Sequence, residues 1–416
     1  MPRACLLGWT LFALAPGCAV VAFDGGEPVV TAPTGTQATG TQAAGTQAAG
    51  TQAAGTQAAG TQAAGTVADP GTLADPGALE TRGETGLAPP AKRAEDPIEP
   101  IFPPALVDGA TIGLVAPASS IDETSVRRAV DELQRRGYHV KLSLGYRQRK
   151  AYLAADDAVR AAELNAFFAD PDVDAILCLR GGYGSPRILD RVDYEVIRAR
   201  PKILIGYSDI TALLNAVERR TGLVVFHGPM AKELGDGLSR YSDTYFWPAL
   251  RGASPLFEDW GGGGPGGRES LTVVAGGACE GRLVGGNLSV LVATIGTPYE
   301  FDSHGTILFL EEVNEKAFRI DRMLNQLRLG GQLASTRGVI LGSFSGCGND
   351  LAETSERLDD LFAEYFAGLG VPVLSGFPIG HTRDQVVLPI GVRARLDADA
   401  RKLTILETPT REASRE

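Results

Sequence analysis

Apolar positions from about residue 106 onward alternate between short buried runs and longer amphipathic stretches. Runs typical of buried strands lie at 112–117, 139–144, 174–179 and 203–205. Between them, 122–137 and 156–168 carry apolar residues at helical spacing, with charges on the opposite face. Strands that alternate with helices predict a mostly parallel sheet covered on both faces, of the flavodoxin- or Rossmann-like kind.

A second α/β pattern begins near residue 278. Strands are predicted at 306–310, 338–344 and 371–374, helices at 290–295 and 318–329, and a terminal hairpin joins 392–396 to 403–406. We expect a glycine turn at 285–288, directly before the first of these helices.

The stretch between the two patterns has few periodic signals and contains a glycine-rich segment at 261–267. We therefore predict four parts in the last three quarters of the chain. These are an N-terminal α/β domain at 105–232, a connector at 233–277, a smaller C-terminal α/β domain at 278–408 and a tail at 409–416.

The first eighteen residues have the features of an export signal. Arg3 precedes an apolar run at 6–14 that is too short to span a bilayer, and small residues lead to Cys18. This ending is similar to a bacterial lipobox, which predicts lipid attachment at Cys18 and an exported protein anchored in the cell envelope. The alternatives are cleavage without lipid, which gives a soluble periplasmic protein, and a cytoplasmic protein if the signal is not used.

Residues 19–104 are of low complexity. Five copies of Thr-Gln-Ala-Ala-Gly end at Gly65, and two hexads that end in Ala-Asp-Pro-Gly follow. A segment with so little to bury is predicted to stay disordered and to act as a tether. A repeat that expanded by replication slippage fits the same pattern.

The formal charge of the 416-residue chain is −11, and no basic stripe stands out, so a nucleic-acid partner is not expected. Beyond the signal, Cys178, Cys279 and Cys347 form no close pair and no metal-ligand spacing, so no metal or other cofactor is expected. Cys178 lies in an apolar strand and is predicted to be a core residue.

The strongest candidate chemistry lies at 202–217, where a buried strand turns into a helix through Gly206-Tyr207-Ser208-Asp209. A serine on a sharp strand-to-helix turn stands above the sheet edge, beside the free N–H groups of the helix. Ser208 is therefore a candidate nucleophile. The alternative is that Ser208 or Asp209 only caps the helix.

A glycine-rich loop follows the neighbouring strand, at 180–184. Gly181 and Gly182 allow the backbone to approach a ligand and to present its N–H groups. A phosphate cradle is one reading, although the spacing of a dinucleotide or Walker motif is missing. An oxyanion or substrate-binding loop beside Ser208 is the other, because both loops follow neighbouring strands at the same sheet edge.

The chain contains only four histidines, which limits the choice of a general base. His381 follows a strand and lies in a loop of glycines and a proline, where a positioned functional side chain is expected. Glu311 and Glu312 end the strand at 306–310. The alternative for each of these side chains is a solvated or packing residue.

Taken together, the segments resemble the LD-carboxypeptidase (muramoyltetrapeptide carboxypeptidase) family of serine peptidases, which also includes the microcin C immunity peptidases. The matching stretches occur in the family's order and cover nearly all of 106–408; they lie at 111–117, 170–184, 202–214, 285–288, 308–324 and 376–382. The resemblance implies a Ser-Glu-His triad of Ser208, Glu311 and His381, with Glu311 favoured over Glu312. It also implies an oxyanion site made of the backbone N–H groups of Asp209, Gly181 and Gly182.

Three functions remain as hypotheses. The first is a serine carboxypeptidase that hydrolyses the L,D-peptide bond before the terminal D-Ala of murein tetrapeptides, with a muropeptide or a peptidoglycan stem peptide as its partner. The second is an immunity-type amidase that cleaves a peptide–nucleotide conjugate. The third is a lipoprotein that binds peptides without cleaving them. Membrane contact is expected only through the lipid anchor, and the family often forms homodimers, which the sequence neither supports nor excludes.

Overall fold

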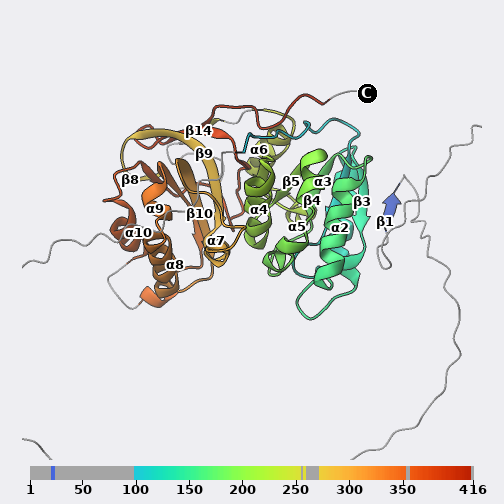
Figure 1. The fold of residues 1–416 in the computed structure, drawn as a ribbon, viewed down its shortest axis with the longest axis horizontal. Helices are drawn as coiled ribbons and strands as arrows, with labels where there is room; N and C mark the ends of the chain where they lie inside the picture. The colour runs from blue at the N-terminus through green and yellow to red at the C-terminus, as the bar shows by residue number, and fades with distance from the viewer. Residues whose placement is uncertain (1–19, 24–97, 254–255, 259–270, 353–356, 414–416) are drawn as a thin grey trace, which may run out of the picture. The chain divides into compact units, whose positions relative to one another are not determined.

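The computed structural model describes residues 20–23, 98–253, 256–258, 271–352 and 357–413 (Figure 1). The predicted signal with Cys18, the repeats of the tether and the glycine-rich segment at 261–267 lie outside the described residues. Within the described ranges, no helix has the length and apolar character needed to cross a membrane.

The first sheet contains five parallel strands in the order β3-β2-β4-β5-β6. Their bounds are β2 (Thr111–Val115), β3 (His139–Ser143), β4 (Ala175–Cys178), β5 (Ile203–Gly206) and β6 (Val225–His227). This order, with the second strand outside the first, is that of flavodoxin-like folds, as predicted. A short strand, β1 (Val20–Phe23), lies antiparallel to β3 within the segment predicted to be a tether.

Amphipathic helices follow these strands, and their bounds are α1 (Glu123–Arg135), α2 (Asp157–Ala169), α3 (Tyr194–Ala199) and α4 (Thr211–Thr221). The helix α1 begins where the Asp122 carboxylate accepts a hydrogen bond from the Ser125 N–H. The helix α4 ends at Gly222, which has a φ of 77°. The helices α2, α3 and α4 pack side by side in a row.

Residues that were predicted to be a connector form part of the first core. The helices α5 (Ala231–Asp236) and α6 (Arg240–Leu250) lie there, and the large side chains of α6 are buried in the same cluster as the first sheet, namely Tyr241, Phe246, Trp247 and Leu250. Pro248 inside α6 obscured the helical pattern. The predicted tether also ends too late: Ile101 donates its N–H to Gly222 O at 2.8 Å, so the chain already packs on the fold before residue 104.

The second sheet has four parallel strands in its middle, in the order β9-β10-β11-β12. These are β9 (Ala278–Asn287), β10 (Thr306–Val313), β11 (Gly338–Ser345) and β12 (Val373–Ser375). Antiparallel strands flank them: β14 (Arg393–Asp397), β15 (Lys402–Ile405) and β7 (Leu256–Glu258) on one side, and β8 (Thr272–Ala275) on the other. The predicted terminal hairpin is therefore present as β14 and β15.

The helices of this half are α7 (Leu288–Thr294), α8 (Ala317–Leu329), α9 (Gln332–Ser335) and α10 (Leu358–Phe366). The glycine turn predicted at 285–288 is wrong, because Gly285 and Gly286 continue β9. Their φ values of 144° and 139° are positive, a backbone conformation that glycine adopts readily and other residues rarely do. A Cβ on Gly285 would lie 2.0 Å from Phe309 O, and one on Gly286 would lie 2.5 Å from Thr211 Oγ1.

The two faces of the second sheet contribute to different cores. On β10, Ile307 and Phe309 belong to the large core shared with the first sheet, whereas Leu308 and Leu310 pack with Leu324 of α8 in a second cluster. This alternation follows from the two-residue period of a strand. One face of the second sheet therefore lies against the first half of the molecule.

A strand from the C-terminal half completes the first sheet. The strand β13 (Leu388–Ile390) pairs antiparallel with β6, so that Leu388 lies opposite His227. The chain then crosses to β14 in the second sheet. In Figure 1 the two halves lie side by side, and α4 of the first half contacts β9 and α7 of the second. The described residues from 98 onward form one compact unit.

Candidate active site

Ser208 lies at the carboxyl end of β5, where the chain turns through the 3-10 turn η3 (Ser208–Ile210) into α4. Its φ of 61° is left-handed, which is rare for a side-chain-bearing residue and is typical of a strained strand-to-helix turn. A Cβ on Gly206 would lie 2.8 Å from Ile210 Cγ2, so the turn is tight enough to require glycine before it.

The capping alternative for Ser208 and Asp209 does not hold. Neither η3 nor α4 has a side-chain hydrogen bond at its cap. The buried Asp209 carboxylate instead accepts the Ser185 N–H at 2.7 Å, and Ser185 Oγ donates to Asp209 O. Burial raises the pKa of Asp209, and these donors oppose that shift. Asp209 thus ties the serine turn to the glycine-rich loop.

The glycine-rich loop lies directly against Ser208. A Cβ on Gly181 would lie 3.0 Å from Ser208 Cβ and 3.2 Å from both Ser208 Oγ and Asp209 N. The loop is also held from its other side, since the Tyr183 N–H donates to Ser119 Oγ at 3.0 Å. Two N–H groups of the loop, those of Tyr183 and Ser185, are therefore used inside the protein, which disfavours a phosphate cradle.

Arg160 of α2 holds the end of the glycine-rich loop in place through hydrogen bonds. Its side chain is fully buried and donates to three backbone carbonyls: Pro117 O, Gly184 O at 2.8 Å and Ala155 O at 3.2 Å. Its charge is paired with Asp157, which Arg187 also contacts. One guanidinium thus connects the loop after β2 with the end of the glycine-rich loop.

Glu311 and Glu312 are neighbours on β10 but point to opposite faces of the sheet. Glu311 continues the face of Ile307 and Phe309, toward the first half, and is fully buried. Glu312 lies beside the start of α7, where it accepts the Asn287 amide at 2.9 Å and the Ser289 N–H at 2.8 Å. Burial raises the pKa of Glu312, partly offset by these donors.

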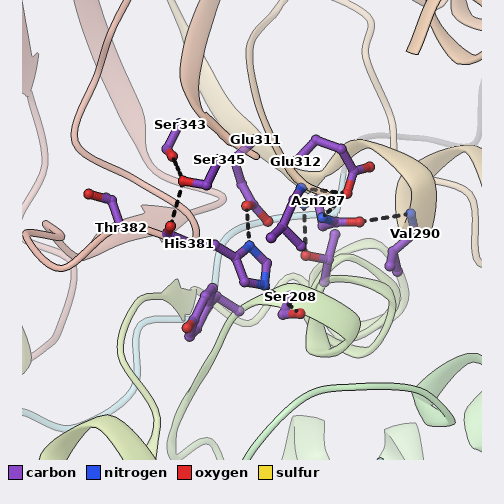
Figure 2. A network of polar contacts seen from close by, with 12 residues as sticks. Ser208, Asn287, Val290, Glu311, Glu312, Ser343, Ser345, His381 and Thr382 are labelled. Carbon is purple, nitrogen blue, oxygen red and sulfur yellow. Dashed lines mark hydrogen bonds and ion pairs between the residues drawn. The ribbon is translucent and has the colours of Figure 1, made fainter. Parts of the chain in front are cut away.

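His381 joins the two halves of the site. Its Nδ1 lies 2.8 Å from Glu311 Oε2, and its Nε2 lies 3.0 Å from Ser208 Oγ (Figure 2). Its loop bends at Gly376 and Gly380, with φ values of 83° and 93°. Ser345 Oγ donates to His381 O at 2.6 Å and holds the loop to β11.

The electrostatic surroundings favour a protonated His381 at moderately acid pH. Burial alone would lower the pKa of this imidazole, but the hydrogen bond and the charge of Glu311 outweigh burial. Glu312 and Glu233 add to the effect, and the pKa lies above its ordinary value. The ring is tilted against Tyr207, with 5.0 Å between the ring centroids.

The structure thus brings together Ser208, Glu311 and His381, and it places Gly181 and Asp209 N beside the serine. Tyr207 and His227, which no sequence pattern marks as functional, pack around the same carboxylate and imidazole. Only the position of His227 could have indicated a role, because it ends β6, the strand next to the one that leads to Ser208. In the part of the chain that the structure describes, no three His, Cys, Asp or Glu side chains form a metal-binding group.

Comparisons with known proteins relate both halves of the chain to one family. Residues 112–228 match the LD-carboxypeptidase N-terminal domain, and 280–396 match the LD-carboxypeptidase C-terminal domain. The chain is 38% identical over 314 residues to a probable murein peptide carboxypeptidase of Bacillus subtilis, which covers 75% of this chain and 96% of the relative. It is 33% identical over 303 residues to the murein tetrapeptide carboxypeptidase of Pseudomonas aeruginosa, covering 70% and 94%.

Among solved structures, the microcin C7 self-immunity protein MccF has a TM-score of 0.68 and 28% identity, covering 75% of this chain and 100% of its own. Its complex with glutamyl sulfamoyl guanosine gives the same values. The predicted two-domain α/β fold is confirmed by this likeness.

Proposed function

Because the chain belongs to the LD-carboxypeptidase family of serine-type peptide hydrolases, we propose that it removes the terminal D-Ala from murein tetrapeptides by hydrolysing the preceding L,D-peptide bond. The relatives named for murein peptides support this substrate class. The observation that carries the proposal is the chain of two hydrogen bonds, from Glu311 through His381 to Ser208.

The geometry suggests the roles of the three side chains. With its Nδ1–H donated to Glu311, the neutral imidazole of His381 has a free Nε2 that can accept the Ser208 proton. Ser208 Oγ then attacks the carbonyl carbon of the scissile bond. His381 passes the proton to the departing D-Ala amine, and a water molecule hydrolyses the acyl-enzyme by the same steps in reverse order.

The oxyanion of the tetrahedral intermediate needs N–H donors beside Ser208. We assign this role to the backbone N–H groups of Asp209, Gly181 and Gly182, because Gly181 packs against Ser208 and Asp209 N. One such donor contributes about 3 kcal/mol of transition-state stabilisation. The Asp209 and Arg160 contacts described above would keep these donors in place.

The test is incubation of the purified chain with defined muropeptides, read by mass spectrometry. We expect loss of one alanine mass from the tetrapeptide, no reaction of the tripeptide, and no effect of EDTA. Ser208→Ala should lower turnover by about 10⁴-fold or more without lowering the melting temperature. His381→Ala added to Ser208→Ala should cause no further loss, because the two side chains act as one unit. Full turnover in Ser208→Ala would refute the mechanism.

A second candidate is the cleavage of a peptide–nucleotide conjugate. It is favoured by the likeness to a protein solved with glutamyl sulfamoyl guanosine. The same assay distinguishes the two functions if an aminoacyl sulfamoyl nucleoside is included. A kcat/KM higher for this conjugate than for the tetrapeptide would replace the murein substrate. The third hypothesis, a binding lipoprotein without activity, is not retained for a member of a hydrolase family.

We also propose that the protein is exported and anchored by lipid on Cys18. The support is the lipobox-like end of the signal at 15–18. We expect a labelled fatty acid to appear on the wild type and not on Cys18→Ser, which should move from the membrane fraction to the soluble fraction. Equal labelling of the two proteins would contradict lipid attachment at this residue.

A further inference from the structure

Two buried polar groups beside the proposed triad have no hydrogen-bond partner among the described residues. One is Glu311 Oε1, the carboxylate oxygen that does not face His381; the other is the imidazole of His227, at both ring nitrogens. Glu311 is 0% exposed and His227 is 1% exposed. Buried polar groups are almost always hydrogen-bonded. The free-energy cost of leaving one without a partner is largest for a charged group such as a carboxylate.

The two groups lie in the same small region. The His227 ring packs edge-on against Phe309, with 5.2 Å between centroids, and Phe309 precedes Glu311 by two residues on the same face of β10. The Tyr207 ring contacts both histidines, at centroid distances of 6.0 Å to His227 and 5.0 Å to His381. His227 is therefore buried next to the proposed triad, close enough to Glu311 for the carboxylate to act on its pKa.

His227 has the right chemical form to act as a donor. Burial lowers its pKa to about 4, opposed by Glu311 and reinforced by His381, so the ring is neutral at physiological pH. A neutral imidazole carries one N–H. His227 is not placed as a second general base, because neither of its ring nitrogens is hydrogen-bonded to Ser208 Oγ, whereas Nε2 of His381 is.

We propose that His227 is a positioning residue of the proposed triad, holding the free oxygen of Glu311 through a bridge from its ring N–H to one buried water and on to Oε1. The structure places no direct hydrogen bond between the two groups, and a single water needs only two to four polar partners. The bridge would fix the carboxylate plane, which in turn fixes the ring of His381. This inference rests on the proposed function, since it assigns Glu311 to the triad.

The first test does not require turnover. With only four histidines in the chain, the imidazoles can be labelled with ¹⁵N and assigned by single substitutions in the full-length protein. His227→Phe keeps an aromatic ring but loses the N–H, so the charge of Glu311 is less shared and acts more strongly on His381. We expect the titration midpoint of His381 to rise by about half a pH unit or more. His227→Gln retains a donor and should keep the wild-type midpoint.

The charged and titratable groups that act on His381 are otherwise unchanged in these variants: Glu311 and Glu312 of β10 and Glu233 of α5. His139→Gln, on the exposed start of β3, is the matched control and should have no effect. A His381 midpoint that is the same in folded His227→Phe as in wild type would overturn the proposal, because simple packing by His227 would be replaced well by phenylalanine.

A second measurement leaves His227 in place and covers the case in which His227→Phe does not fold. In Glu311→Gln the bridge loses its charged acceptor, and the ¹⁵N signals of His227 should change from one fixed tautomer to a mixture. Glu312→Gln, on the other face of β10, should leave them unchanged. Identical His227 signals in wild type and in Glu311→Gln would refute the bridge.

Kinetics then connect the bridge to the reaction. On a murein tetrapeptide, His227→Phe should lower kcat by about tenfold and leave KM within about twofold, because the residue acts on the triad and not on substrate binding. In the Glu311→Gln background, His227→Phe should cause no further loss, and a further tenfold loss there would contradict the assignment. A wild type without activity on any tetrapeptide would refute the proposed function while leaving the NMR test of the bridge valid.

Discussion

At the residue scale, the choice of Glu311 over Glu312 as the partner of His381 depends on which face of β10 each side chain occupies. Alternate residues of β10 face different cores, and Glu311 shares the face of Ile307 and Phe309 while Glu312 shares the face of Leu308 and Leu310. Only the first face looks toward Ser208 and His381. Two adjacent carboxylates thus have different environments: one is paired with an imidazole, and the other receives N–H donors near α7.

The raised pKa of His381 gives a prediction for the pH profile. As the proposed base, His381 must be neutral, so kcat/KM should rise with pH through its pKa, with a midpoint above 6.5. Glu311→Gln removes the charge that holds this pKa up, and the midpoint should move to lower pH. The same variant should lower kcat by about 10²-fold or more, because an amide allows the wrong tautomer.

The control for this profile is Glu312→Gln, which should keep the wild-type midpoint within a few tenths of a pH unit and most of the turnover. Its carboxylate contributes less to the pKa of His381 than Glu311 does. If Glu312→Gln were the variant that abolished activity, the roles of the two carboxylates would have to be exchanged.

At the element scale, the loops that surround Ser208 are held by side chains from α2 and from the glycine-rich loop itself. Arg160 is the main support, because its buried guanidinium donates to the carbonyls of Pro117, Ala155 and Gly184. We expect Arg160→Met to lower the free energy of unfolding by about 2–4 kcal/mol, since it removes the side-chain donor of three carbonyls, of which Gly184 O retains the Arg187 N–H. It should also lower kcat, because the end of the glycine-rich loop is released.

Arg187→Met is the matched control, because Arg187 contacts the same Asp157 from an exposed position. Its loss should cost less than about 1 kcal/mol. Both stabilities are measured by urea unfolding. Equal effects of the two substitutions would show that the shared ion pair with Asp157, and not the buried carbonyl contacts, is what matters.

The sequence predicted the elements with a clear period and missed those without one. The strands β2 to β5 and the helices α1, α2, α4 and α8 follow the apolar pattern closely. Ser208 and His381 were candidates because each lies just after a strand, whereas Glu311, which lies on β10, was selected through the family resemblance. The helix α6 was missed because it contains Pro248, and β9 was missed because Gly285 and Gly286 indicate a turn. Those glycines are required by a neighbouring backbone and by Thr211, which no local pattern reveals. The role of His227 depends on Phe309 and Glu311, far away in sequence, and could not be read from its own segment.

At the scale of the whole molecule, the two halves are joined through buried polar contacts. Asn215 of α4 donates to Gly285 O at 2.9 Å, and the Asn287 N–H donates to Thr211 Oγ1 at 3.0 Å. Glu218 of α4 lies nearby, 3.9 Å from Arg282 on β9. Burial raises the pKa of Glu218 to about 7, and Arg282 only partly opposes the shift.

The raised pKa of Glu218 predicts a pH-dependent stability of the join. The Glu218 carboxyl binds its proton more tightly in the folded protein than in the unfolded chain, where the pKa of a glutamate is near 4.5. Its contribution to the free energy of unfolding is therefore full below pH 4.5 and is lost as the pH rises through 7. Glu218→Gln should therefore be more stable than wild type at pH 8, by about 3 kcal/mol, and equal to it near pH 4.5. Thermal unfolding at the two pH values measures the difference.

The control is Glu280→Gln on β9, the strand of Arg282, because Glu280 is half-exposed and pairs with Arg393. It should change stability by less than about 0.5 kcal/mol at either pH. A Glu218→Gln variant that is less stable than wild type at pH 8 would mean that the pair with Arg282 outweighs the cost of burial.

The placement of β13 constrains the order in which the protein is made. A ribosome releases β6 long before Leu388, the residue that covers its edge opposite His227. Until then the first sheet has an open edge, which other chains can pair with. His381 also emerges after β6 and close to β13, so until then the nascent chain carries Ser208 without its proposed base. The proposed base and the strand that closes the sheet edge therefore arrive together, within a few residues of each other.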